Sequence, residues 1–281
     1  MQGPAVRGLG ILLAEATTDG EAQPVWSLGR PAPRDERQRR ASRECLLGLA
    51  AVEAMLDDEG APREAIAGER TALVYATAGG YAASNRSFIE GSGRSIHFAY
   101  TAPAVVPAEV AIQFGITGPY AIFLGGPPAT LRAIWHASIL LDSGSCDRAL
   151  VLAVETFEEC ADLYARGHRL AKRPLVEAAG CLWLEPGRGD LVFESRGASR
   201  RRPGHARARG AETFGCEPLV ALDQWRRAPA PGPLVLTGVW RGEEARLVWS
   251  EAPSAHRRIA GTKPQSTVRM RPGIAVDERQ A

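Results

Sequence analysis

Short apolar runs alternate with segments of helical periodicity through the first two thirds of the chain. The apolar runs predict strands at 5–16, 71–80, 120–124 and 148–155. Apolar residues at helical spacing predict helices at 46–56, 82–91, 107–115, 129–141 and 157–172. Strands that alternate with helices in this way indicate a layered α/β fold.

Two hairpins are predicted in addition to these elements. The apolar runs 180–185 and 189–196 are joined by a short Pro-Gly-Arg turn, which is typical of a hairpin. The segment 232–249 predicts a second hairpin with Gly242 in its turn.

The character of the chain changes after residue 195. Residues 195–212 are rich in Arg, Gly and Ala without apolar periodicity, which predicts a solvated loop or linker. The last thirty or so residues are polar and patternless, and we expect them to be disordered. The expected parts are therefore a main body at 1–195, a loop at 196–216, a short β-hairpin region at 217–250 that completes the domain, and a tail at 251–281.

Composition narrows the function classes. A chain of 281 residues with 45% hydrophobic residues can form one large domain or two intimate halves. The net charge of +2 is too small to favour binding of the negatively charged backbone of a nucleic acid. The Arg-rich loop nevertheless leaves binding to an RNA backbone as an alternative. No uncharged apolar run approaches the roughly 18–20 residues of a membrane span, and no signal peptide is evident, so we expect a cytoplasmic protein.

The five cysteines are an odd number and lack C-x-x-C spacing, which disfavours a disulfide framework and a zinc site. We expect no metal and no cofactor.

The stretch "FLGGPPATLRAIW" (123–135) joins an apolar run to a helical pattern through Gly125 and Gly126. In many α/β enzymes such a strand–turn–helix elbow holds a nucleophile. Here Pro127 and Pro128 follow the glycines, and neither offers a nucleophilic side chain. Prolines are tolerated in the first turn of a helix, so the elbow geometry is expected to survive without the chemistry.

Four segments in the same order resemble the N-terminal half of the β-ketoacyl synthase family over roughly residues 5–195. They are "PAVVPAEVAIQFGITGP", "GITGPYAIFLGGPPATLRAI", "LLDSGSCDRALVLAVE" and "RPLVEAAGCLWLE". The resemblance implies an α/β, layered thiolase-like fold, that of a truncated ketosynthase, with a mixed sheet and buried helices. Residues 1–195 would then be the ketosynthase-like N-terminal half.

Counted from Gly118 and Pro119, the nucleophilic cysteine of the family falls on Pro127. Proline lacks both the thiol and the backbone N–H that the family uses as an oxyanion donor. The histidine motifs of the family are missing as well. None of the five histidines is followed by Gly, and those that follow Gly have no Lys at the distance that the family's motif requires. The five are His97, His136, His168, His205 and His256. The resemblance thus implies an inactive ketosynthase homologue.

The family includes cysteine-less subunits that pair with an active ketosynthase, and this chain resembles a short, cysteine-less subunit of the chain-length-factor type. The resemblance implies a heterodimer with an active ketosynthase and an acyl carrier protein as a further partner, in polyketide, aryl-polyene or fatty-acid-type biosynthesis. The strand 120–124 would be the pairing edge, with interface candidates Tyr120, Ile122 and Leu124.

Further site candidates follow from the same resemblance. The tunnel candidates are Tyr75, Thr77, Tyr81 and Phe88, although Tyr75 and Phe88 are equally interpreted as core residues. The candidates for docking a carrier protein are Arg200, Arg201 and Arg202, which could equally belong to a disordered insertion.

Two alternatives remain open. One is a homodimeric thiolase-fold protein that binds an acyl group or an acyl carrier protein without catalysis. The other is an enzyme that uses a different nucleophile, such as Ser143 or Cys146, although Cys146 is better interpreted as a structural thiol.

Overall fold

The computed structural model describes residues 2–15, 25–91, 101–160, 174–196 and 211–250. Its main element is a mixed five-stranded sheet. The strands lie in the order β1 (Ala5–Leu13), β7 (Ala178–Glu185), β5 (Arg148–Glu155), β3 (Thr71–Thr77) and β4 (Tyr120–Leu124). β7 runs antiparallel to both β1 and β5, whereas β5, β3 and β4 are parallel. The four strands predicted from the first apolar runs are all present.

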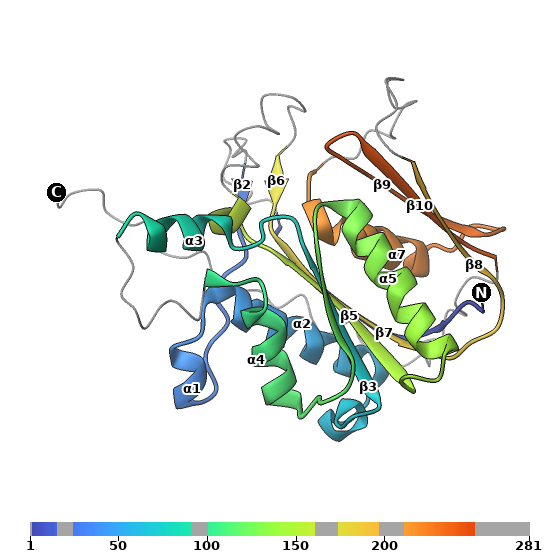
Figure 1. Cartoon of the computed structure of the whole chain (residues 1–281), viewed down its shortest axis with the longest axis horizontal. Helices are drawn as coiled ribbons and strands as arrows, with labels where there is room; N and C mark the ends of the chain where they lie inside the picture. Colours follow the sequence, from blue (N-terminus) through green and yellow to red (C-terminus); the bar gives the residue numbers. More distant parts are fainter. Residues whose placement is uncertain (1, 16–24, 92–100, 161–173, 197–210, 251–281) are drawn as a thin grey trace.

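One face of this sheet is covered by α2 (Arg43–Glu59) and α4 (Val105–Phe114), as Figure 1 shows. The side chain of Ser42 caps the start of α2 by accepting the N–H of Cys45, and Gly60 ends the helix in the left-handed region. Near this face lie the short helices α1 (Glu36–Arg39), η1 (Arg63–Ile66) and α3 (Ala82–Ile89).

The other face of the sheet packs on α5 (Pro127–Asp142) and α7 (Glu217–Arg227). A second, antiparallel sheet covers these two helices, in the order β8 (Leu191–Arg196), β10 (Glu243–Trp249) and β9 (Leu234–Trp240). Helix α5 is therefore buried between two sheets (Figure 1), and ten of its sixteen residues are buried. A two-stranded sheet of β2 (Val25–Trp26) and β6 (Leu175–Val176) completes the described strands.

The prediction of a hairpin at 232–249 is confirmed. β9 and β10 pair over their whole lengths, and Arg241 and Gly242 both have positive φ in the turn between them. The prediction of a hairpin between 180–185 and 189–196 is wrong, because β7 and β8 belong to different sheets. β7 is buried along almost its entire length and lies between two neighbours, whereas β8 is exposed at several positions and joins the second sheet.

The region after residue 210 also differs from expectation. Residues 217–250 begin with helix α7, which was not predicted. The 3-10 turn η3 (Phe214–Cys216), at the end of the expected loop, is buried. The expected tail and most of the expected loop lie outside the described residues. Of the helix predicted at 157–172, residues 157–160 are described and helical.

No helix in the described part of the chain combines the length and the apolar character that a membrane span requires.

The close approach of α2 to β1 generates the first prediction. A Cβ at Gly10 would lie 2.3 Å from the backbone N of Met55 and 2.5 Å from the carbonyl oxygen of Ala51. Gly10→Ala should therefore push α2 off the sheet and lower the free energy of unfolding by about 3 kcal/mol in urea denaturation. Leu13→Ala on the same strand is the control and should cost less than about 1 kcal/mol, because Leu13 is already 41% exposed. Equal effects of the two substitutions would contradict this packing.

Candidate functional site

The elbow expected at residues 123–135 is present where β4 ends and α5 begins. Gly125 has φ of 142°, a conformation that favours glycine, and its N–H donates to the carbonyl oxygen of Thr77 at 2.9 Å. Pro127 and Pro128 occupy the first turn of α5, and both are buried. The helix thus begins two residues earlier than predicted and includes both prolines.

The first turn of α5 offers little for acyl chemistry. Pro127 and Pro128 have no N–H, and the N–H of Ala129 already donates to the carbonyl oxygen of Gly126 at 2.9 Å. The hydroxyl of Thr130 is buried and donates to the carbonyl oxygen of Gly215 at 2.6 Å. The first three residues of the helix therefore present neither a nucleophilic side chain nor a free N–H that could bind an oxyanion.

Strand β9 covers the elbow directly. A Cβ at Gly126 would lie 2.4 Å from Cε3 of Trp240, so the indole ring packs on the bare backbone of this glycine. A Cβ at Gly238 would lie 2.7 Å from Cβ of Pro127, so β9 also contacts the first residue of the helix. Phe214 supports the indole ring edge-on, with ring centroids 5.7 Å apart.

Sequence reasoning did not identify this cover. The signal that could have indicated it is Gly238, because a glycine inside a strand often marks the close approach of another backbone.

A second constellation lies at the end of β5. The side chain of Glu155 is buried, and its Oε1 accepts the N–H of Ala78 at 2.6 Å and of Gly215 at 3.2 Å. Its Oε2 lies 3.1 Å from Sγ of Cys160, which donates to it. Burial raises the pKa of Glu155 to about 7, although these hydrogen bonds act in the opposite direction. Glu155 thus joins β5 to the end of β3, to η3 and to the helical turn at 157–160.

Three more carboxylates in this region are buried and bonded. Glu177 pairs with Arg43 and accepts the N–H of Leu28 at 2.7 Å. Glu44 accepts the hydroxyl of Thr156 at 2.7 Å. Glu159 bonds Ser84 and the N–H of Ala83, and burial raises the pKa of Glu159. Each carboxylate holds a segment in place, which favours a structural role over a catalytic one.

The predicted tunnel residues do not gather at the elbow. Tyr75 and Tyr81 are both buried in the core cluster beneath α2, on the opposite side of the sheet from α5. The hydroxyl of Tyr81 lies 3.1 Å from that of Ser42, and the hydroxyl of Thr77 points to Glu155. Phe88 on α3 is half-buried. The candidates Arg200, Arg201 and Arg202 lie outside the described residues.

The predicted interface residues lie on the outermost strand of the sheet. Among the described residues, β4 pairs with β3 alone. Tyr120 and Leu124 are 52% and 64% exposed, whereas Ile122 is half-buried against the core. Ile112 on α4 is also exposed. Large apolar side chains thus accompany an unpaired strand edge.

The alternative nucleophiles, Cys146 and Ser143, are not activated by the described groups around them. Burial raises the pKa of Cys146, which opposes thiolate formation. The hydroxyl of Ser143 contacts the carbonyl oxygen of Leu140 and the hydroxyl of Ser145, and neither group is a base. His136, the one histidine in the described part of the chain, packs against Phe123.

The description of the chain as cysteine-less is wrong. The chain contains five cysteines, and all are buried (Cys45, Cys146, Cys160, Cys181 and Cys216). None of them lies in the elbow. In the described part of the chain, no group of three or more His, Cys, Asp or Glu side chains could hold a metal ion.

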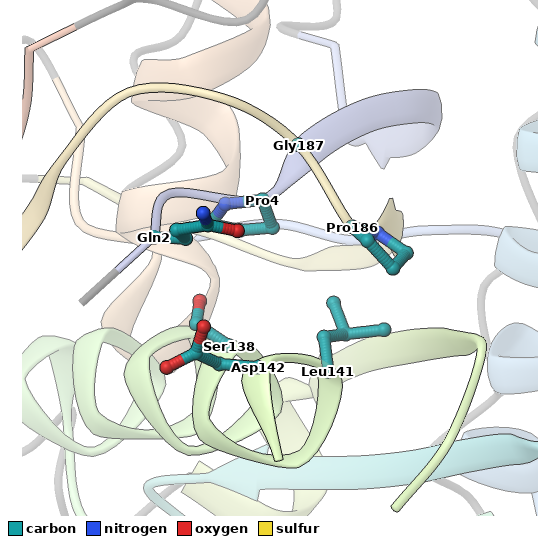
Figure 2. A pocket seen from close by; sticks show the side chains of 7 residues that line it. All are labelled: Gln2, Pro4, Ser138, Leu141, Asp142, Pro186 and Gly187. Carbon is teal, nitrogen blue, oxygen red and sulfur yellow. The ribbon is translucent and has the colours of Figure 1, made fainter. Parts of the chain in front are cut away.

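A small depression lies at the other end of α5 (Figure 2). It measures about 80 Å³ and is lined by Gln2, Pro4, Ser138, Leu141, Asp142, Pro186 and Gly187. Ligand pockets usually measure roughly 300–1,000 Å³, so this depression does not suit an acyl chain.

Comparisons with known proteins identify a similar family and similar folds. Residues 32–169 match the family model for the beta-ketoacyl synthase N-terminal domain. No curated protein sequence matches the chain.

Solved structures with a similar fold include the following three. The ishigamide ketosynthase/chain length factor aligns with a TM-score of 0.68 and 14% identity, over 88% of this chain and 99% of that one. A beta-ketoacyl synthase from Burkholderia phymatum STM815 aligns with a TM-score of 0.63 and 15% identity, over 89% and 99%. The ketosynthase ApeO in complex with its chain length factor ApeC from Xenorhabdus doucetiae aligns with a TM-score of 0.59 and 15% identity, over 88% and 100%. The predicted layered, thiolase-like α/β fold with a mixed sheet and buried helices is confirmed.

Glu155 should make stability depend on pH. Its pKa is higher in the folded protein than in the unfolded chain, so its contribution is complete below about pH 4.5 and is lost as pH rises through about 7. Between pH 5 and 8.5 the free energy of unfolding should fall by roughly 3 kcal/mol from this group. In Glu155→Gln the decline should be smaller by that amount, as urea denaturation across this pH range would reveal. Parallel pH profiles for the two proteins would contradict a raised pKa at Glu155.

The cover over the elbow should shield a thiol placed there. In Pro127→Cys the new thiol should react slowly with iodoacetamide, because Pro127 is buried, Gly238 packs against it and Trp240 packs over the neighbouring Gly126. Adding Trp240→Ala should expose the thiol and raise its alkylation rate by about tenfold or more. The five native cysteines are buried and give a low background, and Trp240→Ala alone is the matched control. Fast labelling of Pro127→Cys with Trp240 intact would contradict the cover.

Proposed function

We propose that this chain is a non-catalytic, ketosynthase-like partner subunit of the chain-length-factor type. It pairs with an active ketosynthase in polyketide, aryl-polyene or fatty-acid-type biosynthesis. The observation that carries the proposal is a strand–turn–helix elbow in which Pro127 and Pro128 begin the helix and Trp240 packs over Gly126.

The loss of chemistry follows from the residues of the elbow. Acyl transfer by a ketosynthase needs a thiolate at the helix N-terminus and an N–H that binds the developing oxyanion. Pro127 supplies neither group, and Pro128 removes the next N–H as well. Loss of a single oxyanion donor typically costs about 3–4 kcal/mol of transition-state stabilisation. Loss of the nucleophile in addition supports a pseudoenzyme over a slow enzyme.

The exposed edge of β4 supports a partner subunit. Its side chains Tyr120 and Leu124 are more than half exposed, and the strand contains no charged residue. Unprotected apolar edges of this kind favour pairing with another chain. One of the structurally similar complexes contains a ketosynthase with its chain length factor, so this fold is compatible with such pairing.

The acyl carrier protein remains a proposed further partner, in line with the family resemblance. In this assembly the chain would contribute a wall to the acyl site of the partner subunit rather than a site of its own. The alternative is a homodimer that binds an acyl group or a carrier protein without catalysis, because the β4 edge would suit a second copy equally well.

Co-expression with a candidate partner ketosynthase should separate these functions. We expect the two chains to co-purify as a heterodimer, and omission of this chain should change the length of the acyl product. Recovery of this chain only as a homodimer, with unchanged products, would support the alternative.

Substitution of the edge strand makes the test specific. Leu124→Lys places a charge on an apolar contact and should weaken binding to the ketosynthase by about tenfold or more, measured by size-exclusion chromatography and calorimetry. Val192→Lys on β8 is the matched control, since Val192 is also an exposed apolar residue on an outer strand, and it should bind normally. Normal binding by Leu124→Lys would place the interface elsewhere.

A further inference from the structure

Three strands of the first sheet have the same order and directions as the three strands of the second sheet. In the first sheet, β1 is the earliest strand in the chain and lies beside β7, which is the latest. β7 in turn lies beside β5, the strand of this sheet that precedes it in the chain, and both pairs are antiparallel. The second sheet repeats this order as β8-β10-β9, again antiparallel throughout. Helices α5 and α7 directly precede β5 and β9, and both lie between the sheets (Figure 1). Strand β9 therefore corresponds to β5.

The plan differs at the next position. β5 has a second neighbour, β3, which is followed by β4. Strand β9 has no second neighbour among the described residues, so its backbone groups on that side lack a strand partner. In the part of the chain that the structure describes, no strand of the second sheet takes the position that β3 has in the first.

Strand β9 itself has no feature that opposes pairing at this edge. Its sequence, LVLTGVW, contains no charge and no proline, and it is seven residues long. The opposite edge strand, β8, carries the exposed charges of Glu194 and Arg196. Charged residues on edge strands prevent association, and strands that lack them are templates for a further strand.

We propose that β9 pairs with β9 of a second copy of this chain, antiparallel about a two-fold axis near Thr237. This arrangement would join the two three-stranded sheets into one sheet of six strands. It involves an edge distinct from β4, so it is compatible with a ketosynthase bound at β4 and does not depend on the proposed function.

The side chains of β9 are self-complementary in this arrangement. Thr237 would face Thr237 of the partner subunit, and Val235 would face Val239 of the partner subunit. All three side chains are exposed in the single chain, with Val235 at 40% and Val239 at 44%. Threonine pairs and β-branched pairs are favourable neighbours across antiparallel strands, and no like charges meet because the strand has none.

A single cysteine tests the proposed register. In Thr237→Cys the two thiols should face each other across the axis, so mild oxidation should convert most of the protein to a disulfide-linked dimer. The five native cysteines are buried and should not react. Val192→Cys, on the outer face at the far edge of the same sheet, is the control and should remain largely monomeric on a non-reducing gel. Equal cross-linking of the two variants, or none at Thr237→Cys, would overturn the register.

A charge on the edge tests the association itself. The measurement uses the full chain with Leu124→Lys, so that association through β4 does not contribute. We expect light scattering to show a dimer, and Val239→Lys should raise its dissociation constant by about tenfold or more without changing the thermal midpoint at low concentration. A monomer before Val239→Lys, or an unchanged dimer after it, would overturn the proposal. Ketosynthase binding is measured separately, so failure here leaves the proposed function standing.

Discussion

The packing of α5 between two sheets is the constraint on which the rest of the structure depends. Its buried residues contribute to a core that includes Val74 and Val151 from the first sheet and Leu236 and Leu247 from the second. The contact is close because Gly126 and Gly238 present bare backbone where the sheet meets the helix. The packing that completes the core therefore also places Trp240 over the elbow.

The buried carboxylates stabilise the region that adjoins this contact. Glu155 accepts the N–H of Gly215, which follows Phe214, and Phe214 supports the ring of Trp240. Phe214 has a positive φ of 44°, which is unfavourable for a bulky residue and requires surrounding contacts to hold it. The cover over the elbow is thus connected to the end of β5 through η3, although these segments lie about sixty residues apart in the chain.

The proposed loss of acyl-transfer chemistry is compatible with retention of the fold, because the two depend on different atoms. A helix start needs φ near −65° and no N–H at its first positions, and proline meets both conditions. Acyl transfer needs a thiol and an N–H at the same positions, and proline has neither. The chain keeps instead two strands, β4 and β9, whose outer edges lack charge in a protein with 23% charged residues. Association is the property that such edges favour.

Local pattern was enough to identify the main strands and helices, the β9–β10 hairpin and the elbow with its prolines. Each of these depends on neighbours in sequence: apolar period, turn residues and the absence of an N–H in proline. Local pattern did not predict which strands pair with each other, since β7 and β8 have the spacing of a hairpin yet join different sheets. The tertiary structure alone decided that Trp240 covers Gly126 and that burial raises the pKa of Glu155 to about 7, because these contacts join residues far apart in the chain.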